Sequence, residues 1–183
     1  AARKTADKAI NILQGRCVGG STTVNWTSSF RTPDDTLAYW QAHFGLQDYR
    51  SDALAPWFAQ AEARLGIAPW GAPPNENNEL LRRGAQRLGW HSDAIRRNVR
   101  DCWNLGSCGL GCPTNAKQSM LVTTIPAALE RGARLLVETR AQAFELRSGR
   151  ITGLDCVAVA PDGSADGGRT LRVLCGRTVS GSL

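Results

Sequence analysis

Apolar residues recur at helical spacing through the first two thirds of the chain, and this pattern predicts four helices. Leu37, Trp40 and Phe44 form one such stripe, which begins after a capping sequence of Thr, Pro and Asp and ends at Gly45. Glycines end the other stripes as well, because glycine readily adopts the left-handed conformation that closes a helix. The four predicted helices cover residues 32–45, 52–65, 79–88 and 119–131.

The segments between these stripes lack a clear period. Residues 1–14 are predicted to form a short helix or an extended lead-in, and residues 15–25 a glycine-rich loop that opens towards a helix. Prolines and a glycine interrupt residues 68–75, so an irregular segment is expected there. Residues 90–117 are predicted to be a loop. Pro126 lies inside the last apolar stripe and predicts a kink or a late helix start.

From residue 133 onward the period changes to two, which is typical of strands. Turn sequences at 148–150 and 161–163 separate the apolar runs and indicate hairpins. The predicted strands cover residues 135–139, 142–146, 151–160 and 170–175. Helices followed by a meander of strands favour an α+β or α/β piece rather than a complete layered domain.

Composition excludes several classes of protein. The chain has 183 residues, of which 42% are hydrophobic and 21% charged, as expected of a folded protein. No apolar run approaches the roughly 20 residues of a membrane span, so no transmembrane segment is predicted. The net charge is +6, but the arginines are dispersed, which argues against a nucleic-acid partner. The start of the chain does not resemble a signal peptide, and the compartment, cytoplasmic or periplasmic, stays open.

The glycine-rich loop contains the sequence Gly-Arg-Cys-Val-Gly-Gly-Ser-Thr-Thr-Val-Asn at residues 15–25. Successive glycines allow a tight turn and a close approach of the backbone to a ligand. Ser21 adds a hydroxyl group, and the amide of Asn25 can both donate and accept hydrogen bonds. A glycine-rich loop alone is a weak signal, and on chemistry alone a purely structural loop and helix cap is the commoner explanation.

The whole string, with Arg31 six residues after Asn25, resembles the signature of the glucose-methanol-choline (GMC) family of FAD-dependent oxidoreductases. The resemblance implies that Gly19, Gly20 and Ser21 contact the FAD pyrophosphate and ribityl chain, and that Asn25 lies beside the isoalloxazine ring. The full set of cofactor-binding residues implied by the resemblance is Gly15, Arg16, Gly19, Gly20, Ser21, Asn25, Trp26 and Ala143. Ser29 departs from the pattern, because the family usually has an aromatic residue there.

The rest of the chain resembles the same family less specifically. The segment 54–58 with Glu62 is similar to the helix after the signature, and Asn98 with residues 108–119 resembles the branch that oxidises long-chain alcohols and related bacterial dehydrogenases. Residues 134–139 resemble the strand that returns to the dinucleotide-binding domain. The implied architecture is part of an FAD-binding α/β fold. It comprises an FAD-contacting loop (1–31), a helical cap region with the cysteine cluster (32–132) and strands of the FAD-binding domain (133–183).

Three of the six cysteines, Cys102, Cys108 and Cys112, are clustered before Pro113. Three thiolates in a short loop can ligate an iron–sulfur cluster, and similar spacing occurs in bacterial FAD sugar dehydrogenases. A zinc site would need a fourth ligand, for which His91 is the nearest candidate. The third interpretation is a structural loop with free or disulfide-linked cysteines, as in the alcohol-oxidising branch. All three remain open from the sequence.

The resemblance implies oxidation of a CH–OH group, in a primary alcohol or a sugar, with electrons passing to oxygen or to a redox partner. Neither the dinucleotide fingerprint nor the family's catalytic histidine is found, because His43 and His91 do not match that motif. No catalytic residue is therefore predicted here, and we expect the chain to be an internal piece of a longer enzyme that is inactive alone. The alternative is a non-catalytic metal-binding or interaction module that keeps the loop only as structure.

Overall fold

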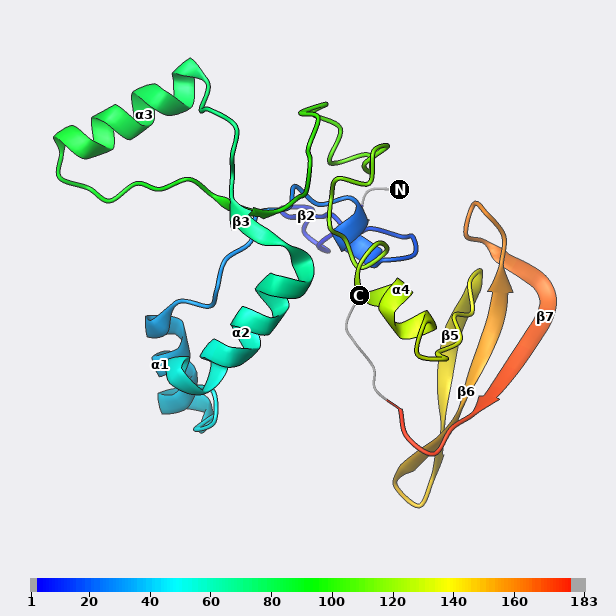
Figure 1. Cartoon of the computed structure of the whole chain (residues 1–183). Coiled ribbons are helices and arrows are strands. Elements are labelled where there is room, and N and C mark those ends of the chain that lie inside the picture. The colour runs from blue at the N-terminus through cyan, green and yellow to red at the C-terminus, as the bar shows by residue number, and fades with distance from the viewer. Residues whose placement is uncertain (1–2, 179–183) are drawn as a thin grey trace. The chain divides into compact units, whose positions relative to one another are not determined.

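The structure is a computed structural model, and it describes residues 3–178. The chain divides into two compact units, Ala1–Ala128 and Leu129–Leu183, each of which is described by itself. Figure 1 shows helices and irregular segments in the first unit and a three-stranded sheet in the second. This mixture of helices and antiparallel strands confirms the α/β character expected of the piece. No helix in the described part of the chain is long and apolar enough to span a bilayer.

The first two helices form where the apolar periodicity predicted them. Helix α1 spans Asp34–Phe44 and α2 spans Ser51–Leu65. Each ends at a glycine in the left-handed conformation, Gly45 with φ 66° and Gly66 with φ 59°. Helix α3, Glu76–Arg87, begins three residues earlier than predicted. The reason is its cap, because the Asn75 side chain accepts a hydrogen bond from the backbone of Asn78 at 2.9 Å.

The last predicted helix is much shorter than its apolar stripe. Helix α4 spans only Thr124–Leu129, whereas residues 119–131 were expected to be helical. Pro126 has no backbone N–H and is tolerated in the first turn of a helix, so it favours the late start. The preceding residues form turns, in which Val122 and Thr123 donate backbone hydrogen bonds to the Ser119 carbonyl, each at 3.1 Å.

Two short antiparallel pairs lie in the first unit. The lead-in is extended, with β1 (Arg3–Lys4) paired to β2 (Asn11–Ile12). Strand β3 (Ile67–Pro69) pairs with β4 (Arg96–Asn98), so the expectations of an irregular segment from 68 and of a loop throughout 90–117 were wrong at these residues. Proline fits an edge position that requires no N–H donor. The partners are far apart in sequence, and local periodicity could not reveal this pairing.

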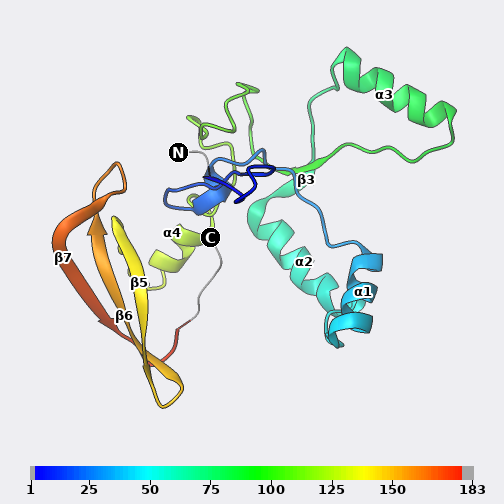
Figure 2. The same cartoon turned by 180° about the vertical axis from the view of Figure 1, so that it is seen from behind.

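The second unit is a meander of three antiparallel strands in the order β5–β6–β7 (Figure 2). Strand β5 covers Thr139–Arg147, β6 covers Arg150–Val159 and β7 covers Ala165–Leu174. The two turns fall where the sequence predicted them. Of the strand expected at 135–139, only the last residue, Thr139, is in a strand, and it is the first residue of β5. Ala143 pairs with Asp155 next to a register irregularity between Ala141 and Ala143.

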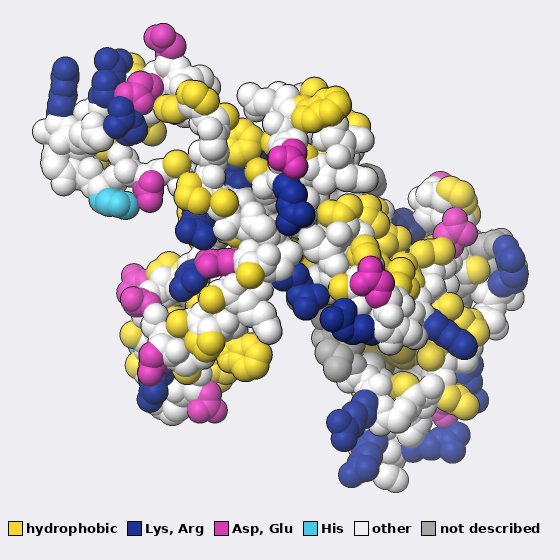
Figure 3. All heavy atoms as spheres, in the orientation of Figure 1, with side chains coloured by type: hydrophobic (Ala, Val, Ile, Leu, Met, Phe, Trp, Pro, Cys, Tyr) yellow, Lys and Arg dark blue, Asp and Glu magenta, His cyan; other side chains and the backbone are white. Residues whose placement is uncertain are grey.

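Burial in the described residues is unusual because polar groups dominate it. Four polar residues are almost completely buried, namely Thr27, Asn98, Lys117 and Ser119. Buried apolar residues are few: Leu37, Ala116 and Cys156. Large apolar side chains remain at the surface instead, as the yellow side chains in Figure 3 show; Leu110, for instance, is 92% exposed. The first unit is therefore organised around polar contacts, which position the segments described below.

An ion pair connects the segment after the glycine-rich loop to α2. The Arg31 guanidinium donates two hydrogen bonds to the Glu62 carboxylate, from Nε at 2.8 Å and from Nη2 at 2.7 Å. This bidentate geometry is the strongest form of the pairing. The hydrogen bonds from Arg31 hold the pKa of Glu62 below its ordinary value. Both residues belong to the patterns identified in the sequence, and the structure brings them together.

We predict that Glu62→Gln lowers the melting temperature of the chain at neutral pH. Because the folded-state pKa of Glu62 is depressed, its contribution is complete above the ordinary carboxyl pKa of about 4.3 and is lost as pH falls through the folded value. The difference in melting temperature between wild type and variant should therefore close below about pH 4. Glu76→Gln, at an exposed position, is the control and should change little. A difference that persists unchanged at pH 3 would contradict the assignment.

Candidate functional site

The glycine-rich loop forms a compact turn followed by a single 3-10 turn, Gly20–Thr23. Gly19 and Gly20 have positive φ angles of 88° and 57°, which L side chains rarely adopt. The loop is closed at its start, where the Gly15 backbone N–H donates to the Ser21 hydroxyl at 2.9 Å. A Cβ atom at Gly15 would lie 2.8 Å from the Gly20 carbonyl oxygen. Glycine at these positions is thus required by the packing of the loop on itself.

Threonine hydroxyls lock the second half of the loop. The Thr22 hydroxyl donates to the Gly19 carbonyl at 2.6 Å and accepts the Met120 backbone N–H at 3.0 Å. The Thr23 hydroxyl donates to the Val18 carbonyl at 3.0 Å. These contacts join the loop to a segment almost a hundred residues away. These hydrogen bonds fix the conformation of the loop.

The polar groups that the sequence assigned to the cofactor lie on the open side of this loop. Arg16, Ser21, Asn25 and Trp26 are exposed, and Gly15, Gly19 and Gly20 are half-buried. The Asn25 side-chain oxygen accepts the Thr27 backbone N–H at 3.1 Å, which fixes the orientation of the amide. Its amide nitrogen has no hydrogen-bond partner among residues 3–178 and is available to a ligand. Ala143 lies on β5 in the second unit.

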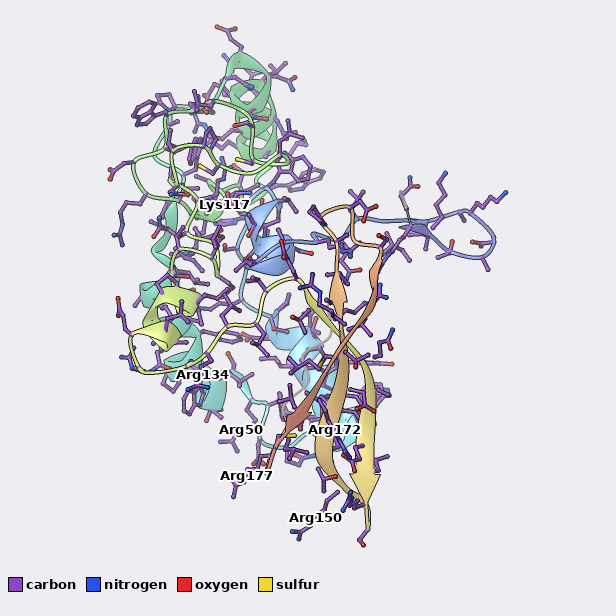
Figure 4. The ribbon with its side chains drawn as sticks, turned by 90° about the vertical axis from the view of Figure 1, so that its right-hand side faces the viewer. Arg50, Lys117, Arg134, Arg150, Arg172 and Arg177 are labelled. Atoms are coloured by element: carbon purple, nitrogen blue, oxygen red, sulfur yellow. The ribbon has the colours of Figure 1, made fainter. Side chains whose placement is uncertain are left out.

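Lys117 joins the glycine-rich loop to the segment that contains the clustered cysteines. Its side chain is buried, with 3% of the residue exposed, and its ammonium group donates to three backbone carbonyls: Thr23 at 2.9 Å, Asn25 at 2.6 Å and Cys108 at 2.7 Å. An ammonium group has three hydrogens, so its donor capacity is filled. Figure 4 labels Lys117 beside the 3-10 turn of the loop. Burial lowers the pKa of Lys117, and the thiols of Cys108 and Cys112 oppose part of that shift.

A second cation joins the same segments. Arg97 Nε donates to the Thr27 hydroxyl at 2.7 Å, and Arg97 Nη2 donates to the Trp26 carbonyl at 3.1 Å. The Arg97 guanidinium also lies over the Trp70 ring, with its Cζ 4.3 Å from the ring centroid. Thr27 is 1% exposed and has a positive φ of 67°, which these contacts hold in place. Arg97 thereby fixes the backbone at Trp26 and Thr27, the two residues after Asn25.

The segment with the clustered cysteines (residues 102–112, the cysteine loop) packs against the glycine-rich loop and Trp26 (residues 15–26, the signature loop). A Cβ atom at Gly109 would lie 2.7 Å from Cζ2 of Trp26, so the indole ring rests on the glycine backbone. Arg97 Nη2 lies 3.6 Å from the sulfur of Cys108. The Lys117 backbone N–H and the Thr114 hydroxyl each lie 3.5 Å from the sulfur of Cys112. The glycine-rich signature and the cysteine cluster, which are separate in the sequence, are therefore in contact in the structure.

All six cysteines are free thiols in the described chain. Within the described residues, no three His, Cys, Asp or Glu side chains converge to hold a metal ion. The proposed ligand set of Cys102, Cys108 and Cys112 therefore has no support as an iron–sulfur site, nor, with His91, as a zinc site. Glycines Gly109 and Gly111, which form an isolated backbone bridge, fold this segment instead. The structural interpretation of the cluster agrees with these contacts.

Lys117 and Arg97 were not singled out from the sequence. The chain has only three lysines, and Lys117 is the one that follows small residues within a glycine-rich and cysteine-rich region. That isolation was the available signal, because lysine is almost never buried unless its charge is satisfied. Arg97 gave no comparable signal within its Arg-Arg-Asn context. The two histidines are peripheral: His43 stacks on Tyr39 within α1, and His91 is exposed.

Comparison with known proteins places these features in a family. Residues 1–181 match the family model described as GMC oxidoreductase. The chain is 34% identical over 141 residues to an uncharacterised GMC-type oxidoreductase of Sinorhizobium fredii, covering 77% of the chain and 28% of that protein. It is 34% identical over 147 residues to a long-chain-alcohol oxidase of Arabidopsis thaliana, covering 78% of the chain and 19% of that protein. The chain belongs to the GMC oxidoreductase family, and it spans about a fifth to just over a quarter of the length of these relatives.

We predict that Gly19→Ala destabilises the first unit strongly. The new Cβ would lie 2.6 Å from the Thr23 hydroxyl and 2.9 Å from the Leu121 backbone nitrogen, at a φ of 88°. Strain and overlap together should lower the free energy of unfolding by about 2 kcal/mol or more. Gly71→Ala is the matched control, because no atom lies within 4 Å of the added methyl group. Denaturant unfolding of both variants measures the difference, and equal stabilities would refute the described packing.

We predict that Cys112 reacts with alkylating agents at a lower pH than an ordinary thiol. Burial raises the pKa of the Cys112 thiol, but hydrogen bonds from Thr114 and from backbone N–H groups outweigh it and bring the pKa below its ordinary value. The midpoint of iodoacetamide labelling against pH should fall below about 8.5. Thr114→Val should raise that midpoint. Cys156, which is 6% exposed, is the unreactive internal reference; a Cys112 midpoint at or above the ordinary thiol value would contradict the prediction.

Proposed function

We propose that this chain supplies the flavin-binding signature loop of an FAD-dependent oxidoreductase that oxidises a CH–OH group. The observation that carries the proposal is the loop at 15–26. Lys117 and Arg97 hold its C-terminal end by hydrogen bonds, and the polar side chains that the sequence assigned to the cofactor are exposed. Membership of the GMC oxidoreductase family supports the same conclusion. The residues fit an extended dinucleotide, because the exposed face offers a hydroxyl, an amide and an indole in one short stretch.

Each exposed group has a role that follows from its chemistry. The Cβ positions of Gly15 and Gly19 face the protein itself, so Gly20 is the glycine whose backbone can approach the pyrophosphate. The Ser21 hydroxyl can donate to a phosphate or ribityl oxygen. The amide nitrogen of Asn25, which has no partner within the described residues, can donate to the edge of the flavin ring, in an orientation that the contact with Thr27 fixes. Arg16 adds a positive charge on the same loop, and Ala143 would meet the adenine. When bound, FAD supplies the acceptor for the hydride that leaves the alcohol carbon.

The substrate proposed is a primary alcohol, with a sugar hydroxyl as the alternative, and the electron acceptor is oxygen or a redox partner. The relatives described as long-chain-alcohol oxidases support the alcohol. We place no catalytic base in this chain, since His43 stacks on its own helix and His91 stands at the surface. We therefore propose that the chain does not turn over substrate by itself. The base would be provided by a part of the enzyme outside this chain.

We predict that the complete reading frame containing this chain, purified without oxygen, shows flavin absorption that bleaches when a long-chain primary alcohol is added. A sugar is the comparison substrate, and bleaching by the sugar alone would reassign the substrate class. Iron is measured on the same sample, with none expected above background. A colourless protein that takes up no added FAD would overturn the proposed function.

We predict that Gly20→Val in the same reading frame abolishes flavin retention. The valine would be strained at a φ of 57°, and its side chain would occupy space on the phosphate-facing side of the loop. Gly71→Val, at a position with no neighbouring atom within 4 Å, is the control and should retain FAD. Absorbance at the flavin maximum relative to protein absorbance measures retention. Equal FAD content in the two variants would show that Gly20 does not face the cofactor.

A further inference from the structure

We propose that Lys117 is a positioning residue of the flavin site, which holds the backbone of residues 23–25 so that the Asn25 amide faces the flavin. The inference rests on the proposed function, and it adds a residue to which the sequence alone assigned no part in flavin binding. It also assigns an electrostatic role to the buried charge. The observations that carry it are the three carbonyl contacts of the ammonium group, its burial, and the absence of an acidic partner among residues 3–178.

The first step concerns geometry. Two of the three acceptors of Lys117 Nζ are the carbonyls of Thr23 and Asn25, which stand on either side of Val24. Binding both carbonyls to one atom fixes the backbone dihedrals between them, and the side chain of Asn25 projects from this fixed segment. The Asn25 carbonyl contact, at 2.6 Å, is the shortest of the three. The residue proposed to meet the flavin ring is thus the one that Lys117 holds most closely.

The second step concerns why a lysine is used. The third acceptor, the Cys108 carbonyl, belongs to the cysteine loop, so only a donor with three hydrogens at the end of a long stem satisfies all three sites. A glutamine amide could serve at most two of them, and a methionine none. Without the Lys117 ammonium group, the three carbonyls would be buried with no hydrogen-bond donor, which would disfavour the observed backbone conformation.

The third step concerns charge. No carboxylate lies within ion-pair distance of Lys117 among residues 3–178, whereas Arg31 and Arg82 have acidic partners. Carbonyl dipoles solvate the ammonium but do not cancel its charge. A buried, uncancelled cation acts over a longer distance than a surface one, because solvent screens it less. Its field at the open face of Asn25 favours the electron-rich, reduced form of a flavin bound there.

The experiment compares Lys117→Met, Lys117→Gln and the control Lys4→Met in the complete reading frame that contains this chain. Lys4 is exposed on β1, so its replacement makes the same chemical change without the three contacts. The apoproteins are checked by circular dichroism and titrated with FAD, and the reduction potential of the bound flavin is measured against a reference dye. The potential is the readout that a purely structural role would not move.

We expect Lys117→Met to weaken FAD binding by about tenfold or more, and Lys117→Gln to weaken it less. Both variants should lower the flavin reduction potential, since both remove the positive charge, and Lys4→Met should match the wild type in affinity and potential. If Lys117→Met does not fold, Lys117→Gln decides the question by the same two measurements. Folded Lys117 variants with wild-type affinity and potential would overturn the inference while leaving the proposed function intact. A wild-type protein that binds no FAD would overturn both.

Discussion

The buried ammonium group of Lys117 is the contact on which the first unit depends. It binds one carbonyl before Val24, one after it, and one in the cysteine loop, and so connects segments more than ninety residues apart. A buried charge is costly unless every donor is satisfied, and three carbonyls at 2.6–2.9 Å meet that requirement. If the cysteine loop and the signature loop separated, the cation would lose one of its carbonyl acceptors or become exposed to solvent.

The described residues bury little apolar surface, so polar contacts specify this arrangement. Asn98 is 6% exposed and exchanges hydrogen bonds with Gln118, donating from Nδ2 at 2.8 Å and accepting at its carbonyl at 2.9 Å. Its backbone N–H donates to the Thr27 carbonyl at 3.3 Å. Strand β4 therefore lies between the end of the signature and the segment that carries Lys117. Such networks are directional, and they select one register where apolar packing alone would tolerate several.

The glycine-rich signature serves two purposes at once. Gly15 and Gly19 are required by the loop itself, because a side chain at either position would overlap backbone or side-chain atoms of the protein. The residues proposed to contact the cofactor are those left on the open side, above all Ser21 and Asn25. A signature of this kind thus records the folding of the loop as much as its ligand. The cysteine cluster illustrates the same point, because the backbone of Gly109 supports the Trp26 ring.

The sequence by itself determined the features that depend on local conformation. Helices α1 and α2 end at Gly45 and Gly66 as predicted, and the two hairpin turns of the second unit fall at their expected positions, because dihedral preferences act within a few residues. The signature also indicated the family without any structure. Tertiary structure alone decided the pairing of β3 with β4, the ion pair of Arg31 with Glu62, and the burial of Lys117. The β3–β4 pairs join residues 27 to 31 positions apart, Arg31 and Glu62 are 31 apart, and Lys117 and Thr23 are 94 apart. The acceptors of Lys117 are backbone carbonyls, which leave no trace in the pattern of side chains.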